Sequence, residues 1–203
     1  MADGGPPPSW EDVLEVLRCT DVMDNYARQN VRPGGYSAVK SMTLGLAGGR
    51  NPRSSGITAV TYMYPSLFSL FATFLAAHGD RRLAFSSIQL NKGFACRRHR
   101  DSGNVGPSAL AAFGVFMRGR LWTWETDDWV CNLDDLSYSD GVLHAVDSIV
   151  YFDGRCAHET ESYIGERYSL VFYLCSSAET MSNEAFDVLE ALGAVLPSPT
   201  ASP

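Results

Sequence analysis

Two histidines and one aspartate carry the clearest chemical signal in this chain of 203 residues. His99 and Asp101 stand two positions apart, and His158 follows much later. Residues two apart on a β-strand point to the same face, so His99 and Asp101 can bind one metal ion from one strand. His158 can complete the site from a second strand. Two imidazoles and one carboxylate on one face of a metal ion leave other positions open, which is the donor set typical of non-haem Fe(II) sites.

A second signal follows His158. Arg167 and Ser169 open an apolar segment, residues 170–174, which is an unusual place for a cation to face inward. A buried guanidinium needs an anionic partner, because an unpaired buried charge is very costly. A small dicarboxylate would supply that partner in bidentate geometry. A His-x-Asp tripeptide alone would also fit a surface strand with two outward polar residues, and the later residues favour the metal site.

The composition limits the class of protein. Hydrophobic residues make up 45% of the chain and charged residues 19%, which is typical of a globular protein. The net charge of −7 and the pI near 5.0 argue against a protein that binds nucleic acid mainly through charge. The five cysteines are dispersed without C-x-x-C spacing, so we expect a reducing, intracellular compartment, cytoplasmic or nuclear. We see no secretory signal peptide and expect no membrane span.

Turn residues and β-branched or aromatic runs predict a mainly β (α+β) fold. Short strands at close intervals are typical of a sandwich or jelly roll. The expected strands cover residues 41–46, 84–91, 95–99, 108–117, 120–125, 141–146, 148–152 and 168–175.

Three helices are expected outside the strands. Ser9 and Ser182 are predicted N-caps of helices at about 10–19 and 183–192, and Pro65 opens a helix at about 66–77. The chain then divides into an N-terminal leader and helix (1–35), a β domain (36–178), and a C-terminal helix and tail (179–203).

Five arginines near the motif allow two interpretations. They could be solvated side chains that balance an acidic protein, or a basic rim that guides a phosphate-bearing or carboxylate substrate. A polar loop at 48–56 with Arg50 and Arg53 could join such a rim as a mobile flap. The five are Arg97, Arg98, Arg100, Arg118 and Arg120.

The motifs resemble the core of the Fe(II)/2-oxoglutarate-dependent dioxygenases, from about residue 36 to residue 175. Within that superfamily they look most like the TET/JBP-like branch, which is common in microalgae. That branch includes relatives that modify 5-methylcytosine with ascorbate in place of 2-oxoglutarate. The matching motifs are Gln89-Leu90-Asn91, His99-x-Asp101, Asn104-x-Gly106-Pro107-Ser108, Phe113-Gly114, Gly119-x-Leu121-Trp122, Phe152-Asp153-Gly154, His158 and the run from Gly165 to Tyr173.

The resemblance implies a double-stranded β-helix, a cupin-like jelly roll, with iron held at the catalytic centre by His99, Asp101 and His158. It also implies that Arg167, helped by Ser169, binds the far carboxylate of 2-oxoglutarate. Asn91, on the strand before the triad, would face the same cavity. The family chemistry uses O2, converts 2-oxoglutarate to succinate and CO2, and hydroxylates a C–H bond.

Three questions stay open at this point. The cosubstrate could be 2-oxoglutarate, which Arg167 favours, or ascorbate. The substrate could be a modified nucleobase in nucleic acid, a protein side chain or a small metabolite. The branch likeness favours the nucleobase, whereas the acidic charge, including Glu125, Asp127 and Asp128, would repel a phosphate backbone. The third question is whether the chain is an enzyme, because it could also be a non-catalytic β-helix domain that binds a ligand.

Overall fold

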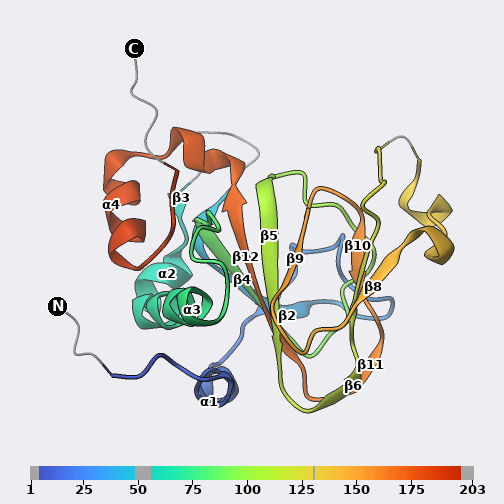
Figure 1. Cartoon of the computed structure of the whole chain (residues 1–203), viewed down its shortest axis with the longest axis horizontal. Coiled ribbons are helices and arrows are strands. Elements are labelled where there is room, and N and C mark those ends of the chain that lie inside the picture. Colours follow the sequence, from blue (N-terminus) through green and yellow to red (C-terminus); the bar gives the residue numbers. More distant parts are fainter. Residues whose placement is uncertain (1–4, 49–55, 130, 198–203) are drawn as a thin grey trace.

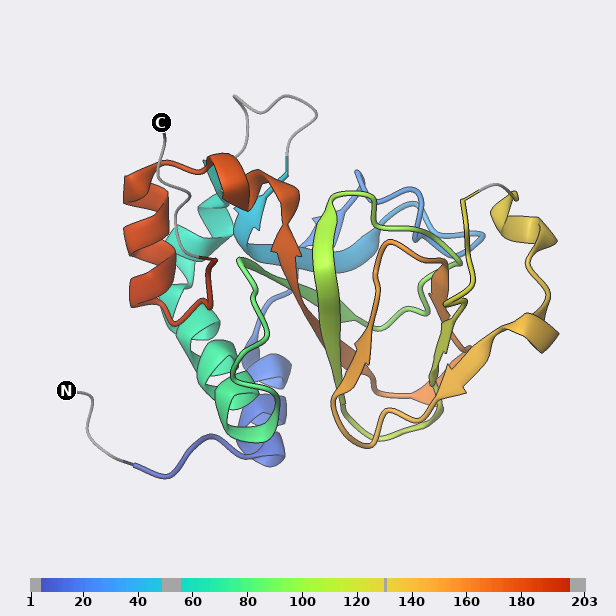
Figure 2. The ribbon, with the colours of Figure 1, turned by 45° about the horizontal axis from the view of Figure 1, so that its top comes forward.

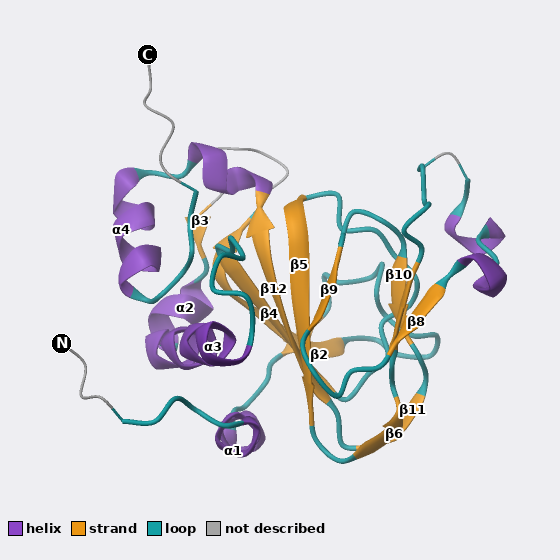
Figure 3. Cartoon of the chain, viewed as in Figure 1, coloured by secondary structure: helices purple, strands orange, loops and turns teal. Residues whose placement is uncertain are grey.

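The computed structural model of the chain describes residues 5–48, 56–129 and 131–197 (Figure 1). It is mainly β, with antiparallel strands in three sheets, the α-helices gathered at one side and two short 3-10 helices at the other (Figure 3). This confirms the predicted mainly β fold with flanking helices. The loop at 48–56 that carries Arg50 and Arg53 lies almost entirely outside the described residues.

The largest sheet forms the centre of the molecule. Its strands run in the order β1-β2-β4-β12-β5-β9, with β3 paired to β2, and all the pairs are antiparallel. The strands are β1 (Asp24–Asn25), β2 (Val39–Ala47), β3 (Gly56–Ile57), β4 (Ser87–Lys92), β5 (Asn104–Phe113), β9 (Val150–Phe152) and β12 (Tyr168–Cys175).

The two faces of this sheet have different roles because side chains alternate along each strand. On β12, Leu170 and Phe172 are fully buried in the core that the helices cover. Ser169 and Val171 point the other way and line a cavity. Ser169 lies opposite Asn91 of β4 in the register, so Asn91 reaches the same cavity. The sheet therefore separates an apolar core from the candidate site.

The helices pack on the core face of the sheet (Figures 1 and 2). The predicted N-cap Ser9 forms a capping box with Asp12, and Ser182 caps the last helix. No described helix has the length and apolarity needed to cross a bilayer. The helices are α1 (Trp10–Cys19), α2 (Ala59–Met63), α3 (Pro65–His78) and α4 (Asn183–Ala191), with 3-10 turns at Leu133–Asp135, Tyr138–Asp140 and Ser176–Thr180.

Helix α3 supplies much of the core. Phe68, Phe71 and Phe74 are fully buried on its inner side, and Trp10 of α1 packs edge-on against Phe74 with ring centroids 4.9 Å apart. Burial of each such side chain contributes on the order of 2 kcal/mol. The core thus fixes the sheet whose opposite face carries the site.

Two small sheets lie on the other side of the large sheet from the helices (Figure 2). One has the order β10-β7-β8 and the other pairs β11 with β6. Their strands are β6 (Phe116–Arg118), β7 (Leu121–Thr123), β8 (Val142–His144), β10 (His158–Thr160) and β11 (Tyr163–Gly165).

Two predicted strands differ in the structure. The segment 95–99 is extended but is not a strand, because its only ladder contact is an isolated bridge at His99. The predicted strand 108–117 ends at Phe113, since Gly114 has φ +117° and a Cβ there would lie 2.2 Å from the carbonyl oxygen of Glu166. Only glycine allows this close approach. The chain turns at Gly114 and continues into β6.

Candidate metal centre

A pair of backbone hydrogen bonds brings the two histidines together. The N–H of His99 donates to the carbonyl of His158, and the N–H of His158 donates to that of His99, both at 3.0 Å. The imidazole ring centroids are consequently 4.1 Å apart. The prediction that His99 and Asp101 lie on one β-strand is therefore wrong. Both lie on an extended loop, and His99 forms a bridge to His158, the first residue of β10.

Asp101 completes a compact set of donor atoms. Its backbone N–H donates to the carbonyl of Gly154 at 2.9 Å, which holds the loop against the turn after β9. Its Oδ1 lies 3.8 Å from Nε2 of His99, and its Oδ2 lies 3.7 Å from Nε2 of His158. One ligand atom from each of the three residues lies within 4.8 Å of the others. This spacing suits one metal ion between them.

Backbone carbonyls set the orientation of both rings. Nδ1 of His99 is 2.7 Å from the carbonyl oxygen of Arg97, and Nδ1 of His158 is 2.9 Å from that of Cys156. A carbonyl can only accept, so each Nδ1 carries the proton and each Nε2 is left as the metal-facing donor. Burial, followed by the neighbouring His158, lowers the pKa of His99 to about 3, so its ring is neutral.

The triad lies in a cavity of about 260 Å³ between the large sheet and the β10-β7-β8 sheet. Its wall combines apolar side chains with polar groups on the cavity face of the large sheet. Such a mixture is typical of a site for a small molecule. The apolar lining includes Leu110, Leu121, Phe152 and Val171, and the polar lining includes Thr43, Gln89, Asn91, Asn104 and Ser169.

Arg167 is buried beside this cavity with part of its hydrogen-bonding capacity unused. It is 4% exposed, its Nε donates to the carbonyl of Gly119 at 3.1 Å, and its Nη2 has no partner among the described residues. The rings of Phe116 and Tyr163 lie 5.4 and 5.6 Å from the guanidinium carbon. Burial lowers the pKa of Arg167, so the site favours an anionic partner for it. Arg167 is not itself among the residues that line the cavity.

The structure adds Arg28, a cavity residue that the sequence analysis missed. Its Nη1 donates to Oδ1 of Asn91 at 3.1 Å, and Nδ2 of Asn91 lies 3.3 Å from Oγ of Ser169. Arg28 follows β1, in the part of the chain assigned to a leader and helix. Nothing in its local sequence marks it, because it reaches the site only through the pairing of β1 with β2.

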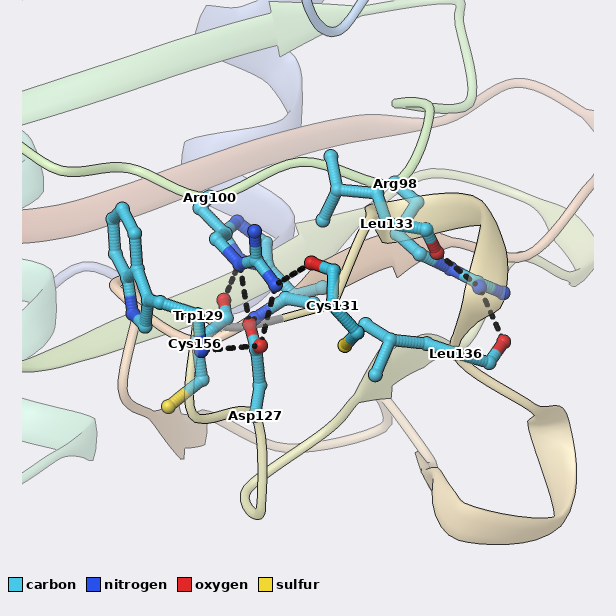
Figure 4. Close-up of polar contacts among 10 residues, drawn as sticks. Arg98, Arg100, Asp127, Trp129, Cys131, Leu133, Leu136 and Cys156 are labelled. Atoms are coloured by element: carbon cyan, nitrogen blue, oxygen red, sulfur yellow. Dashed lines mark hydrogen bonds and ion pairs between the residues drawn. The ribbon is translucent and has the colours of Figure 1, made fainter.

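Asp127 ties the two metal-ligand segments together (Figure 4). It accepts hydrogen bonds from Nε and Nη2 of Arg100 at 2.6 and 2.5 Å, and from the backbone N–H of Ala157 at 2.7 Å. Arg100 stands between His99 and Asp101, and Ala157 precedes His158. Hydrogen bonds from Arg100 lower the pKa of Asp127, whose side chain is fully buried. The carboxylate thus joins both halves of the site.

Arg98 forms a second link on the same side. It donates to Oε2 of Glu159 at 3.1 Å. It also donates to the carbonyls of Leu133 and Leu136 at 2.9 and 2.6 Å (Figure 4). Glu159 is the neighbour of His158, so this pair also bridges the two ligand segments.

The structure divides these arginines into two groups, one with little exposure to solvent and one exposed. The side chains of Arg98 and Arg100 are 12% and 14% exposed and are paired with carboxylates. Arg118 and Arg120 both bind Glu161. Arg98 and Arg100 are thus structural ion pairs with little exposure to solvent. Arg118 and Arg120, 65% and 45% exposed, are solvated ion pairs, and Arg97 is also exposed, in keeping with the interpretation of solvated side chains.

The fold can be compared with solved structures. NgTET1 in complex with 5mC DNA matches with a TM-score of 0.53 and 15% identity over 90% of this chain and 75% of that chain. A 2OG-Fe(II) oxygenase family oxidoreductase from Burkholderia pseudomallei matches with 0.46 and 15% identity, over 80% of this chain and 77% of that one. The non-haem α-ketoglutarate-dependent carbocyclase SnoK from nogalamycin biosynthesis matches with 0.35 and 14% identity, over 81% and 71%.

The match to NgTET1 shows a shared fold across most of both chains. It bears out the expected resemblance to the TET-like oxygenases at the level of the fold. No family model and no curated protein matches the sequence.

Proposed function

We propose that the protein is an Fe(II)- and 2-oxoglutarate-dependent dioxygenase. The observation that carries the proposal is the convergence of His99, Asp101 and His158 in one cavity, with the buried Arg167 beside it. The fold shared with NgTET1 supports it.

The architecture proposed for this activity is a double-stranded β-helix within residues 36–178. The large sheet and the β10-β7-β8 sheet face each other across the cavity, as the two halves of a jelly roll do. Helices α1, α3 and α4 brace the outer face of the large sheet.

The donor set fits iron. Two neutral imidazole Nε2 atoms and one carboxylate would occupy one face of an Fe(II) ion, as in the facial triad of non-haem oxygenases. The carbonyl partners of both Nδ1 atoms fix the rings before metal binds, so little reorganisation is needed.

Arg167 fits the far carboxylate of 2-oxoglutarate. A buried guanidinium with an unpartnered Nη2 is costly in the free protein, and a carboxylate would offset that cost. Ser169 Oγ and the Asn91 amide face the cavity beside it and can donate to the same group. A dicarboxylate fits these residues better than ascorbate does.

When bound, iron and 2-oxoglutarate supply the oxidising chemistry, in which O2 converts 2-oxoglutarate to succinate and CO2 while a substrate C–H bond is hydroxylated. The protein's own residues bind and orient these groups. The apolar wall of Leu110, Leu121, Phe152 and Val171 limits the access of water to the reacting groups.

For the substrate we propose a modified nucleobase. The support is the shared fold with NgTET1, which was solved with 5mC DNA. A protein side chain or a small metabolite is the alternative, in keeping with the net charge of −7.

The test is succinate formation from 2-oxoglutarate. Anaerobically Fe(II)-loaded wild type and His99→Ala would be exposed to O2 without added substrate, because uncoupled turnover needs no knowledge of the substrate. Succinate above the variant's background is the expected result. Iron binding without succinate would direct the work to ascorbate, and absence of metal binding would favour a non-catalytic ligand-binding domain.

A further inference from the structure

Arg28 is a cation that faces the candidate site without a carboxylate partner. Within the described part of the chain it donates a hydrogen bond to the neutral amide of Asn91 and forms no ion pair. Asn25, just before it, accepts the N–H of Ala27 at 3.0 Å and also lines the cavity. This turn holds the guanidinium over the sheet face that carries Asn91 and Ser169.

The cavity and its wall together carry one more positive charge than negative charge. Among the described residues that line it, only Asp101 and Arg28 are ionic. Burial raises the pKa values of Cys96 and Tyr173, so both stay neutral. Arg167 adds a second positive charge beside the wall.

One positive charge in the site stays unneutralised after the proposed metal ion and 2-oxoglutarate are counted. A divalent metal ion and a doubly charged 2-oxoglutarate neutralise each other, and Asp101 offsets one of the two guanidinium groups. One cation therefore remains without a counter-charge in a partly apolar cavity, where it attracts an anion strongly.

We propose that Arg28 is a second oxyanion-binding position, distinct from Arg167, and that it binds a phosphate or carboxylate group of the prime substrate. The inference rests on the proposed function, because the charge count includes the metal and 2-oxoglutarate. It assigns the substrate to an anionic class, which includes a nucleotide but excludes an uncharged metabolite.

The experiment uses the full chain loaded with Zn²⁺, which binds the same ligand types and does not turn over. Wild type, Arg28→Gln and Arg28→Lys are compared, with Arg32→Gln as the matched control. Arg32 lies on the same segment but donates to the carbonyl of Ser37 and does not line the cavity. The affinity for 2-oxoglutarate is measured first by calorimetry.

Matched probes are then bound to the 2-oxoglutarate-saturated protein and followed by saturation-transfer NMR. One pair is 5-methyl-2′-deoxycytidine and its 5′-monophosphate, and the other is N-acetylglycinamide and N-acetylglycine. We expect wild type, Arg28→Lys and Arg32→Gln to prefer the anionic member of one pair by about tenfold. Arg28→Gln should lose that preference while its affinity for 2-oxoglutarate stays within about twofold. The pair that responds identifies phosphate or carboxylate as the group.

Three results would overturn the proposal: no anion preference in wild type, a preference that survives in Arg28→Gln, or a tenfold loss of 2-oxoglutarate affinity in that variant. The last would assign Arg28 to the cosubstrate. Failure of the proposed function has a separate signature, because wild type would then not bind 2-oxoglutarate in the first measurement.

Discussion

The carboxylate of Asp127 accepts hydrogen bonds from Nε and Nη2 of Arg100 and from the backbone N–H of Ala157. These two donors belong to separate segments, and each is a direct neighbour of a proposed metal ligand. A single buried carboxylate therefore sets the distance between the loop with His99 and Asp101 and the strand with His158. Partners of this kind usually affect metal affinity as well as stability.

Asp127→Asn should weaken metal binding and destabilise the protein. The variant removes the charge opposite Arg100 and replaces an acceptor oxygen by a donor amide, so the ligand segments lose their common anchor. We expect roughly tenfold weaker Co²⁺ binding, followed by visible absorption, and a loss of about 2 kcal/mol in the free energy of unfolding.

Asp153→Asn is the matched control. Asp153 is also paired with an arginine, Arg155, but the two side chains are 36% and 51% exposed. Such a surface pair contributes at most about 1 kcal/mol, so metal affinity should stay unchanged. Equal Co²⁺ affinities in Asp127→Asn and Asp153→Asn would refute a positioning role for Asp127.

Arg167→Met should stabilise the ligand-free protein and abolish 2-oxoglutarate binding. The substitution removes a buried charge with an unpartnered Nη2 and keeps much of the side-chain volume beside Phe116. We expect a gain of about 1 kcal/mol in chemical denaturation and at least a tenfold loss of 2-oxoglutarate affinity. Arg155→Met, at an exposed arginine, should change neither quantity, and a less stable Arg167→Met would contradict the account of the buried charge.

The elements that could be predicted from the sequence are those whose signals are local. The caps Ser9 and Ser182 and the apolar run of α3 mark helices that the structure confirms. β12 has the bounds predicted for it. The predicted strand 95–99 is wrong because separate contacts hold the segment, the bridge of His99 to His158 and the hydrogen bond from the N–H of Arg97 to the carbonyl of Val31. Both partners are distant in the sequence, so no local pattern indicates them.

The residues of the candidate site likewise divide into those that the sequence could predict and those that it could not. His99, Asp101 and His158 could be recognised from residue type and order, and the structure brings them together. The partners that support them could not, because Asp127 meets Arg100 across 27 residues and Arg28 meets Asn91 across 63. From the sequence alone, Asp127 is one of several acids expected to repel phosphate, and only the tertiary structure shows it in an internal ion pair.

Protonation of Glu161 should lower the free energy of unfolding at acidic pH. Hydrogen bonds, chiefly from Arg120, lower its pKa from 4.5 to about 2. Because the folded-state pKa lies below the unfolded value, the carboxylate stabilises the protein fully above pH 4.5, and that contribution is lost as the pH falls toward 2. Both arginine partners are solvent-exposed, so we expect the effect to be about 1–2 kcal/mol.

Urea denaturation at pH 3 and at pH 6 measures this contribution. Wild type should be more stable than Glu161→Gln at pH 6, and the difference should shrink at pH 3. Glu179→Gln, at an exposed glutamate, should follow wild type at both values. A difference between wild type and Glu161→Gln that is constant with pH would show that the ion pairs contribute nothing.

Metal binding should stabilise the fold through the triad alone. A ligand that binds only the folded state adds about 2.7 kcal/mol at a free concentration of 100 times its Kd, which corresponds to a rise of several degrees in Tm. Zn²⁺ should therefore raise the Tm of wild type and leave that of His99→Ala and His158→Ala unchanged. His78→Ala is the control, since His78 lies at the end of α3 with Nε2 against the carbonyl of Pro8, away from the cavity. A rise in Tm that persists in both triad variants would place the bound metal elsewhere in the chain and remove the basis for the proposed iron site.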